Sequence, residues 1–229
     1  MHQDGLIKSQ VFLPAQTILN LANHQMRQYA TFLFIDNQAL LVNDQAVSHG
    51  ETKEDWVALA GQYDSGVSDH STGEAREKVL KRVESGEGKV LKMTIGAKPD
   101  QITGRLRESQ QVVRLMFGPE IYESLLTAAA TEEATFSSTR AIPIILEILP
   151  LGMNKAVAVK QICDMLGTAP DRCLAFGDGD NDKEMLALCK YGVSMANAMP
   201  TTARAASFET LSNDEGGVGA FLEKVYGLE

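Results

Sequence analysis

The sequence predicts an α/β protein in two parts, a C-terminal parallel sheet covered by helices, preceded by a domain in which helices and strands mix less regularly. After Pro150-Leu151-Gly152, helical and strand-like patterns alternate at short spacing, which is typical of βαβ units. Before this point, short apolar runs mix with helical stretches and the alternation is less regular. We therefore expect one domain over residues 1–149 and a second over residues 150–229. A chain of 229 residues is long enough for two such domains.

Composition and charge exclude several classes of protein. The chain has 21 Lys and Arg residues against 30 Asp and Glu residues, a formal net charge of −9, so it lacks the basic surface of a general nucleic-acid binder. No apolar run approaches the roughly 20 residues that a membrane-spanning helix needs, and the first residues do not resemble a signal peptide. Cys163, Cys173 and Cys189 show no CxxC spacing and are interpreted as small core residues. We expect a cytoplasmic protein that binds neither nucleic acid nor membranes.

The first part is predicted to follow the order α-β-β, α-β-α-β, α-β-β. A hairpin is expected where two apolar strands, 31–35 and 39–42, flank Asp36-Asn37-Gln38. The segment 65–73 is interpreted as a loop because Gly and Ser are frequent in it. Trp56 is expected to pack inside this domain. The other expected elements are helices over 14–28, 54–60, 74–83, 99–107 and 120–130, and strands over 89–95, 111–117, 134–138 and 142–149.

The second part is predicted as a regular alternation of helix and strand. Its expected helices cover 155–166, 182–189, 201–205 and 218–226, and its expected strands cover 172–176 and 191–195. The first of these helices should end at Gly167, a common residue just after a helix. In open α/β sheets, ligands bind just beyond the carboxyl ends of the strands. The loops after the two strands are therefore the place to look for a site.

An acidic loop follows the first of these strands. The run 176–182 reads Phe-Gly-Asp-Gly-Asp-Asn-Asp, and the carboxylates between Asp178 and Glu184 outnumber their one basic neighbour, Lys183. So many carboxylates in one turn repel each other unless a cation or water relieves them, and hard oxygen ligands suit Mg²⁺. An EF-hand calcium loop fails at its sixth position, Lys183, and at its twelfth, Cys189. The alternative is a solvated loop that only caps a helix, but its place after a buried strand favours a metal site.

Lys155 is the second candidate site residue. It follows Asn154, a plausible N-cap, and so lies in the first turn of a predicted helix. A cation there opposes the helix dipole at a cost of up to about 1 kcal/mol. An exposed lysine would tolerate this cost, yet a lysine and free backbone N–H groups close to a metal loop form an anion site. Phosphate is the anion that this combination suits.

Four segments resemble one protein family. Residues 146–155 (LEILPLGMNK), 175–182 (AFGDGDND), 195–198 (MANA) and 213–218 (NDEGGV) resemble the C-terminal half of the Cof-type phosphatases of the haloacid dehalogenase-like (HAD) superfamily. The αββ(αβαβ)αββ order predicted before residue 150 is similar to the large inserted cap of that family. The resemblance implies a HAD-like doubly wound sheet, of which the C-terminal half is present, with an α+β cap that selects the substrate.

The same resemblance implies a Mg²⁺-dependent phosphatase of small phosphorylated metabolites such as sugar phosphates. Asp178 and Asp182 would form the metal site, with Asp182 acting through a metal-bound water or through Lys155. Lys155 would be catalytic and bind substrate, because its charge stabilises the nucleophile and the transferred phosphoryl group. Asn181 and Asn197 would complete the substrate-binding set. The sequence indicates neither the individual phosphate ester nor the oligomeric state.

The sequence departs from the family at its nucleophile. No DxDGT motif is found, and the one similar segment, 32–36, places Gln38 where the second aspartate should stand. Asp36 is better explained as a turn residue. Without an aspartyl nucleophile, covalent phosphoryl transfer has no acceptor, and without the strand that carries it, strand 172–176 has an open edge. We therefore expect an N-terminally truncated chain, inactive alone. A non-catalytic phosphate- and metal-binding module is the alternative, and an idle scaffold is a weaker one.

Overall fold

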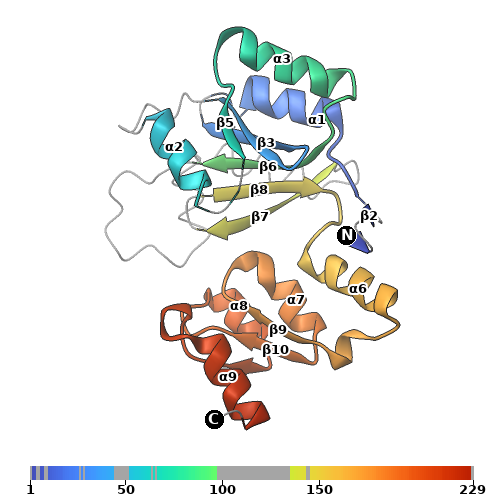
Figure 1. The fold of residues 1–229 in the computed structure, drawn as a ribbon, viewed down its shortest axis with the longest axis vertical. Helices are drawn as coiled ribbons and strands as arrows, with labels where there is room; N and C mark the ends of the chain where they lie inside the picture. Colours follow the sequence, from blue (N-terminus) through green and yellow to red (C-terminus); the bar gives the residue numbers. More distant parts are fainter. Residues whose placement is uncertain are drawn as a thin grey trace. The chain divides into compact units, whose positions relative to one another are not determined.

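The chain forms two compact units, Met1–Gly152 and Met153–Glu229 (Figure 1). This is a computed structural model, and it describes residues 2–3, 6–7, 10–25, 27, 29–43, 52–62, 64, 66–96, 135–142 and 145–227. The division falls after Gly152, close to the expected boundary after residue 149. We call the two parts unit 1 and unit 2.

Unit 1 is built on a six-stranded sheet with the strand order β5-β4-β3-β6-β8-β7. All neighbouring strands are antiparallel except β4 and β5, which are parallel. The strands are β3 (Ala30–Ile35), β4 (Gln38–Asn43), β5 (Val67–Asp69), β6 (Val90–Gly96), β7 (Phe136–Ile142) and β8 (Ile145–Pro150). Two short strands, β1 (His2–Gln3) and β2 (Leu6–Ile7), pair with each other.

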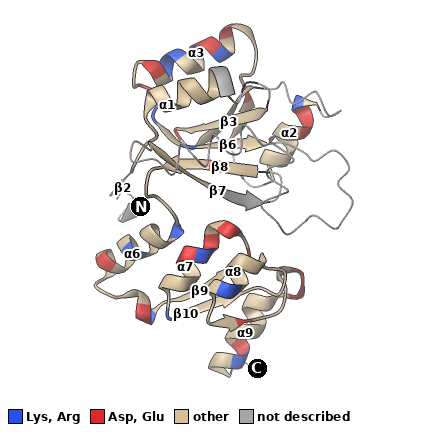
Figure 2. Cartoon of the chain, turned by 180° about the vertical axis from the view of Figure 1, so that it is seen from behind, with Lys and Arg blue, Asp and Glu red and all other residues tan. Residues whose placement is uncertain are grey.

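Helices cover both faces of this sheet. On one face, α1 (Ala15–Asn20) and α3 (Gly73–Glu84) pack on apolar side chains of β3, β6 and β8. On the other face, α2 (Lys53–Ala60) packs Trp56 against side chains of β3 and β4. Because successive side chains of a strand point to opposite faces, Leu33 belongs to the first core and Phe32 to the second. Helix α3 contains both acidic and basic residues (Figure 2).

The predicted hairpin is confirmed, and Asp36 is a turn residue in it. Strands β3 and β4 are joined at Asp36 and Asn37, whose φ angles of 52° and 61° are those of a type I′ turn. The Asp36 carboxylate forms an ion pair with Arg82 at 2.9 Å. Its geometry and its partner are those of a structural residue at the end of a hairpin.

Two other expectations for unit 1 were wrong. The helix predicted over 14–28 is shorter, because α1 ends at Asn20 and a π-helical turn, Leu21–Gln25, follows. The interpretation of 65–73 as a loop fails for β5, which pairs in parallel with β4. The predicted helices 99–107 and 120–130 and strand 111–117 lie outside the described residues, so the complete αββ(αβαβ)αββ order stays a prediction.

Unit 2 contains a three-stranded parallel sheet with the order β11-β10-β9, which confirms the predicted parallel sheet. Its strands are β9 (Leu174–Gly177), β10 (Tyr191–Ser194) and β11 (Phe208–Glu209), the last of which was not predicted. Its α-helices are α6 (Lys155–Leu166), α7 (Lys183–Leu188), α8 (Pro200–Ala205) and α9 (Gly217–Tyr226). Three 3₁₀ turns, Pro170–Arg172, Asp180–Asp182 and Asn213–Glu215, connect these elements. None of the helices in the described residues has the length and apolarity that crossing a bilayer requires.

Candidate functional site

The acidic loop begins at Gly177, the last residue of β9, and this glycine is needed for its shape. A Cβ atom at Gly177 would lie 2.5 Å from the Cβ of Asp182, closer than real Cβ atoms approach. Asp182 therefore folds back over the end of β9, where it is only 5% exposed. A buried carboxylate is stable only when hydrogen-bond donors surround it.

Both carboxylate oxygens of Asp182 have such donors. Oδ1 accepts a hydrogen bond from Nζ of Lys155 at 2.5 Å. Oδ2 accepts from the backbone N–H groups of Asp178, at 3.1 Å, and Gly179, at 3.0 Å. Hydrogen bonds to a charged group are stronger than neutral ones. Asp182 thus ties the first turn of α6 to the loop that follows β9.

Lys155 occupies the first turn of α6, as predicted. The Oδ1 atom of Asn154 accepts a hydrogen bond from the backbone N–H of Val157 at 3.0 Å, which confirms Asn154 as the N-cap. The Lys155 side chain is half exposed, whereas its partner Asp182 is buried. An ammonium group has three donors, and Asp182 takes one of them. The others can be offered to an anion from solution.

Asp178 is held from the other side by Asn197. The Nδ2 group of Asn197 donates to Oδ2 of Asp178 at 3.0 Å, and its Oδ1 accepts from the backbone N–H of Asn213 at 3.0 Å. The backbone N–H of Met199 also donates to the carbonyl oxygen of Asp178, at 2.8 Å. Asn197 therefore bridges the loops after β9 and β11, and it fixes one oxygen of the Asp178 carboxylate.

Two threonines of α8 support the loop, and the sequence patterns did not single them out. Thr202 is completely buried, and its hydroxyl donates to the carbonyl oxygen of Gly179 at 2.8 Å. The Thr201 hydroxyl donates to the carboxylate of Asp180. The local sequence of these two threonines does not mark this role, so only the folded chain reveals it.

The structure thus joins four of the five predicted site residues in one hydrogen-bonded network. Lys155 bonds to Asp182, Asp182 to the backbone of Asp178, and the Asp178 carboxylate to Asn197. The fifth, Asn181, lies in the same loop, partly buried. Among the described residues, the Asn181 side chain has no hydrogen-bond partner, which leaves its amide available to a ligand.

The donor set is compatible with a magnesium ion. In the described parts of the chain, no three His, Cys, Asp or Glu side chains are grouped to hold a metal. Structural zinc and calcium sites use several protein ligands. Mg²⁺ keeps most of its waters and needs one or two carboxylates. Asp178 fits that requirement, because its Oδ1 accepts no hydrogen bond from the described residues.

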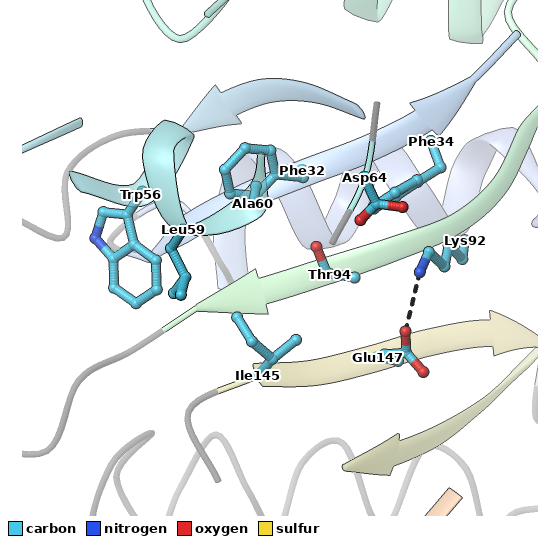
Figure 3. A pocket seen from close by; sticks show the side chains of 10 residues that line it. All are labelled: Phe32, Phe34, Trp56, Leu59, Ala60, Asp64, Lys92, Thr94, Ile145 and Glu147. Atoms are coloured by element: carbon cyan, nitrogen blue, oxygen red, sulfur yellow. Dashed lines mark hydrogen bonds and ion pairs between the residues drawn. The ribbon is translucent and has the colours of Figure 1, made fainter. Parts of the chain in front are cut away.

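Unit 1 contains a separate cavity of about 230 Å³ on the face of the sheet that α2 covers (Figure 3). Nζ of Lys92 lies 3.1 Å from Oε1 of Glu147 and 4.2 Å from the centre of the Phe34 ring. Trp56 is buried as predicted, but it also lines the cavity, and its Nε1 group has no acceptor among the described residues. The sequence patterns gave no sign of this cavity. The lining residues are Phe32, Phe34, Trp56, Leu59, Ala60, Asp64, Lys92, Thr94, Ile145 and Glu147.

The sequence profile of the haloacid dehalogenase-like hydrolases matches residues 4–222. The chain belongs to this family. This confirms the resemblance inferred from the motifs, and the HAD-like α/β fold with it. The match covers both units. It includes the acidic loop and Lys155, so the network described above is part of the segment shared with the family.

Curated relatives of this HAD-like chain include phosphatases. The chain is 42% identical over 84 residues to 5-amino-6-(5-phospho-D-ribitylamino)uracil phosphatase of Bacillus subtilis, a match of 37% of this chain and 31% of that enzyme. It is 53% identical over 55 residues to the HMP-PP phosphatase of Serratia proteamaculans, covering 24% and 20% of the two chains. The matched segment is thus less than half of either relative.

Solved structures share the fold. A Streptococcus mutans protein matches 99% of this HAD-like chain and 73% of its own, with a TM-score of 0.71 and 20% identity. A HAD subclass IIB sugar phosphatase matches 95% and 68%, with a TM-score of 0.64 and 17% identity. At such low identity, these likenesses establish the fold alone.

Proposed function

We propose that this chain provides the Mg²⁺- and phosphate-binding part of a phosphatase that acts on small phosphorylated metabolites. The observation that carries this proposal is the network from Lys155 through Asp182 to Asp178 and Asn197, at the carboxyl end of β9. In parallel α/β sheets, this is where ligands bind. The family supports a hydrolase, and the names of the Bacillus and Serratia relatives support small phosphate esters as substrates.

Each residue of the network has a distinct proposed role. Asp178 would hold Mg²⁺, which when bound would offset the negative charge of the phosphate. Lys155 donates to the phosphate oxygens and stabilises the charge that builds up on them during transfer. Asn181 contacts the phosphate, and Asn197 orients the Asp178 carboxylate. We propose Asp182 as a positioning residue that acts through Lys155, because both of its oxygens already accept hydrogen bonds.

We propose that unit 1 selects the organic part of the ester. Its cavity combines aromatic side chains with the Lys92–Glu147 ion pair, so it suits a flat group that also has polar atoms. Replacing Phe34 by Leu should change which phosphate esters bind and leave the binding of inorganic phosphate unaltered. An identical order of preference among esters in the variant would argue against this role.

A non-catalytic phosphate- and metal-binding module is the second candidate function. The observation in its favour is the position of Asp36, which is a hairpin turn residue paired with Arg82 and not a nucleophile. Sequencing the 5′ end of the transcript tests whether a DxDGT strand is encoded upstream. A closed reading frame there would favour the module.

The binding experiment uses isothermal titration calorimetry with inorganic phosphate, in the presence and absence of Mg²⁺. We expect Mg²⁺-dependent binding that weakens at least tenfold in Lys155→Gln and in Asp178→Asn. Lys160→Gln is the matched control, because Lys160 lies on the same helix, α6, and its side chain is 64% exposed. It should bind phosphate as the parent chain does. Absence of Mg²⁺-dependent binding in the parent chain would overturn both candidate functions.

A hydrolysis assay tests the expectation that this chain is inactive alone. p-Nitrophenyl phosphate is incubated with the parent chain, Asp178→Asn and Lys160→Gln, and free phosphate is measured. Release of phosphate that depends on Asp178 supports the phosphatase. Phosphate binding without release agrees with both candidates, and the upstream reading frame then separates them.

A further inference from the structure

Folding brings two cysteines of unit 2 into contact. Cys163 lies in the last turn of α6, and Cys173 stands directly before β9. Their Sγ atoms are 3.3 Å apart. A disulfide bond is about 2.05 Å long, so the two sulfur atoms need to approach by only about 1.3 Å. The sequence did not predict this pair, because ten residues separate the cysteines and no CxxC motif marks them.

The hydrogen bonds around the pair give the two thiols different roles. The Cys173 thiol donates to the carbonyl oxygen of Ala169 at 3.6 Å. When Cys173 donates there, its sulfur can accept the thiol hydrogen of Cys163. This hydrogen bond, together with burial, raises the pKa of Cys163. Cys163 is buried, whereas Cys173 is partly exposed, so an oxidant in solution reaches Cys173 first.

We propose that Cys163 and Cys173 form a reversible disulfide, with Cys173 as the attacked thiol and Cys163 as the resolving thiol. A peroxide is the oxidant. The Cys173 sulfur takes one oxygen from hydrogen peroxide to give a sulfenic acid and one water. The Cys163 sulfur then attacks the Cys173 sulfur, the S–S bond forms, and the sulfenic oxygen leaves as a second water. Two thiols lose two electrons in total, and one peroxide is reduced to two waters.

The bond would link two elements that carry the candidate site. Cys163 lies on α6, whose first residue is Lys155, and Cys173 precedes β9, whose end leads into Asp178. Intracellular disulfides of this kind are usually transient and serve as redox sensors. The inference rests on the cysteine geometry alone and holds whether or not the proposed phosphatase activity does.

Cys189 is the third thiol of unit 2 and could compete for a partner. It is buried and packs in the same apolar cluster as Cys173. Burial raises the pKa of Cys189. With three cysteines in one unit, the structure predicts which two will pair.

The test is peptide mapping of the full chain after treatment with hydrogen peroxide. Free thiols are blocked with N-ethylmaleimide in denaturant, and the chain is digested with trypsin without reduction. Cleavage after Lys160, Arg172, Lys183 and Lys190 places the three cysteines in separate peptides, 161–172, 173–183 and 184–190. We expect a linked pair of the first two, lighter by two hydrogens than their sum, and a blocked thiol in the third. Dithiothreitol should separate the pair.

Two variants control for chance oxidation. In Cys189→Ser the linked pair should form as in the parent chain. In Cys163→Ser the resolving thiol is gone, so the Cys173 sulfenic acid should persist and react with dimedone. A link to peptide 184–190, three blocked thiols after peroxide treatment, or a sulfinic acid at Cys173 without a link would each overturn the proposal.

Discussion

Gly177→Ala tests the claim that the acidic loop is shaped by the absence of a side chain at the end of β9. The new Cβ atom would lie 2.5 Å from Cβ, 2.7 Å from Cγ and 2.9 Å from Oδ2 of Asp182. Carbon atoms in contact are normally about 3.5–4.0 Å apart, so Asp182 must move by about 1 Å. Because the new Cβ would crowd Oδ2, it would also disturb the hydrogen bonds that Oδ2 accepts from the backbone N–H groups of Asp178 and Gly179.

The expected loss of stability follows from these contacts. Overpacking costs about 1–3 kcal/mol, and weakening hydrogen bonds to a buried carboxylate adds about 1–2 kcal/mol. We therefore expect unit 2 to lose about 3 kcal/mol. In a domain of this size each kcal/mol lowers the melting temperature by roughly 4–8 °C, so the shift is about 12–24 °C.

The assay is thermal unfolding followed by far-UV circular dichroism. Gly219→Ala is the control, because a Cβ there, in helix α9, meets nothing within 4 Å. That change should be neutral or stabilising by up to about 1 kcal/mol. Trp56, the chain's single tryptophan, reports on unit 1, so its fluorescence transition should move less than the dichroism signal. Equal melting temperatures of the Gly177→Ala and Gly219→Ala chains would refute the reasoning.

Three further predictions concern local structure, and urea unfolding measures each. Burial raises the pKa of Asp69, but hydrogen bonds from Lys53 and Ser71 lower it more, from 3.8 to about 2. A lowered pKa means that the ionised Asp69 carboxylate stabilises the fold above pH 3.8. Asp69→Asn should therefore lower the free energy of unfolding at pH 7 by about 1 kcal/mol, a value reduced because the Asp69 side chain is partly exposed to solvent. The difference in stability between the variant and the parent chain should vanish as the pH falls through 2. Asn154→Ala should cost about 1 kcal/mol, and Thr72→Ala, at an N-cap without a side-chain hydrogen bond, should cost less. Asn37→Val should cost about 1–2 kcal/mol because φ is positive there, whereas Asn37→Gly should be tolerated; equal stabilities would contradict the turn assignment.

Features that depend on local sequence were predicted well. The turn at Asp36 and Asn37 was visible because two apolar strands flank residues that tolerate positive φ. The start of α6 was visible because Asn154 is a good N-cap and its hydrogen bond is local. The acidic loop was recognised by its composition and its place after a buried strand. In each case, neighbouring residues supply the physical cause.

Features that depend on distant partners were missed. Strand β5 has three residues, and its stability comes from parallel pairing with β4, so Val67–Asp69 alone shows no strand pattern. The support that Thr202 gives to Gly179 joins residues more than twenty positions apart. The contact of Cys163 with Cys173 has the same origin, since a helix end and a 3₁₀ turn bring the two together. The sequence contains these residues but not their proximity.

The sequence predicted which residues belong to the candidate site, but not how they bond to one another. Lys155, Asp178, Asp182 and Asn197 were named from motifs, and they are joined in one network. The use of both Asp182 oxygens within the protein could not be predicted, because it depends on the backbone fold over Gly177. Whether these residues hold a metal and phosphate stays a prediction.

The segment from Asn197 to Thr202 clamps the acidic loop through a side-chain amide, a backbone N–H and two hydroxyls. All four hydrogen bonds come from six consecutive residues, so they can form together only if the number of residues between Asn197 and Thr202 is kept. A single inserted or deleted residue between them would shift every later contact out of register. Insertions and deletions should therefore be tolerated poorly between Asn197 and Thr202, even at positions that do not contact a ligand.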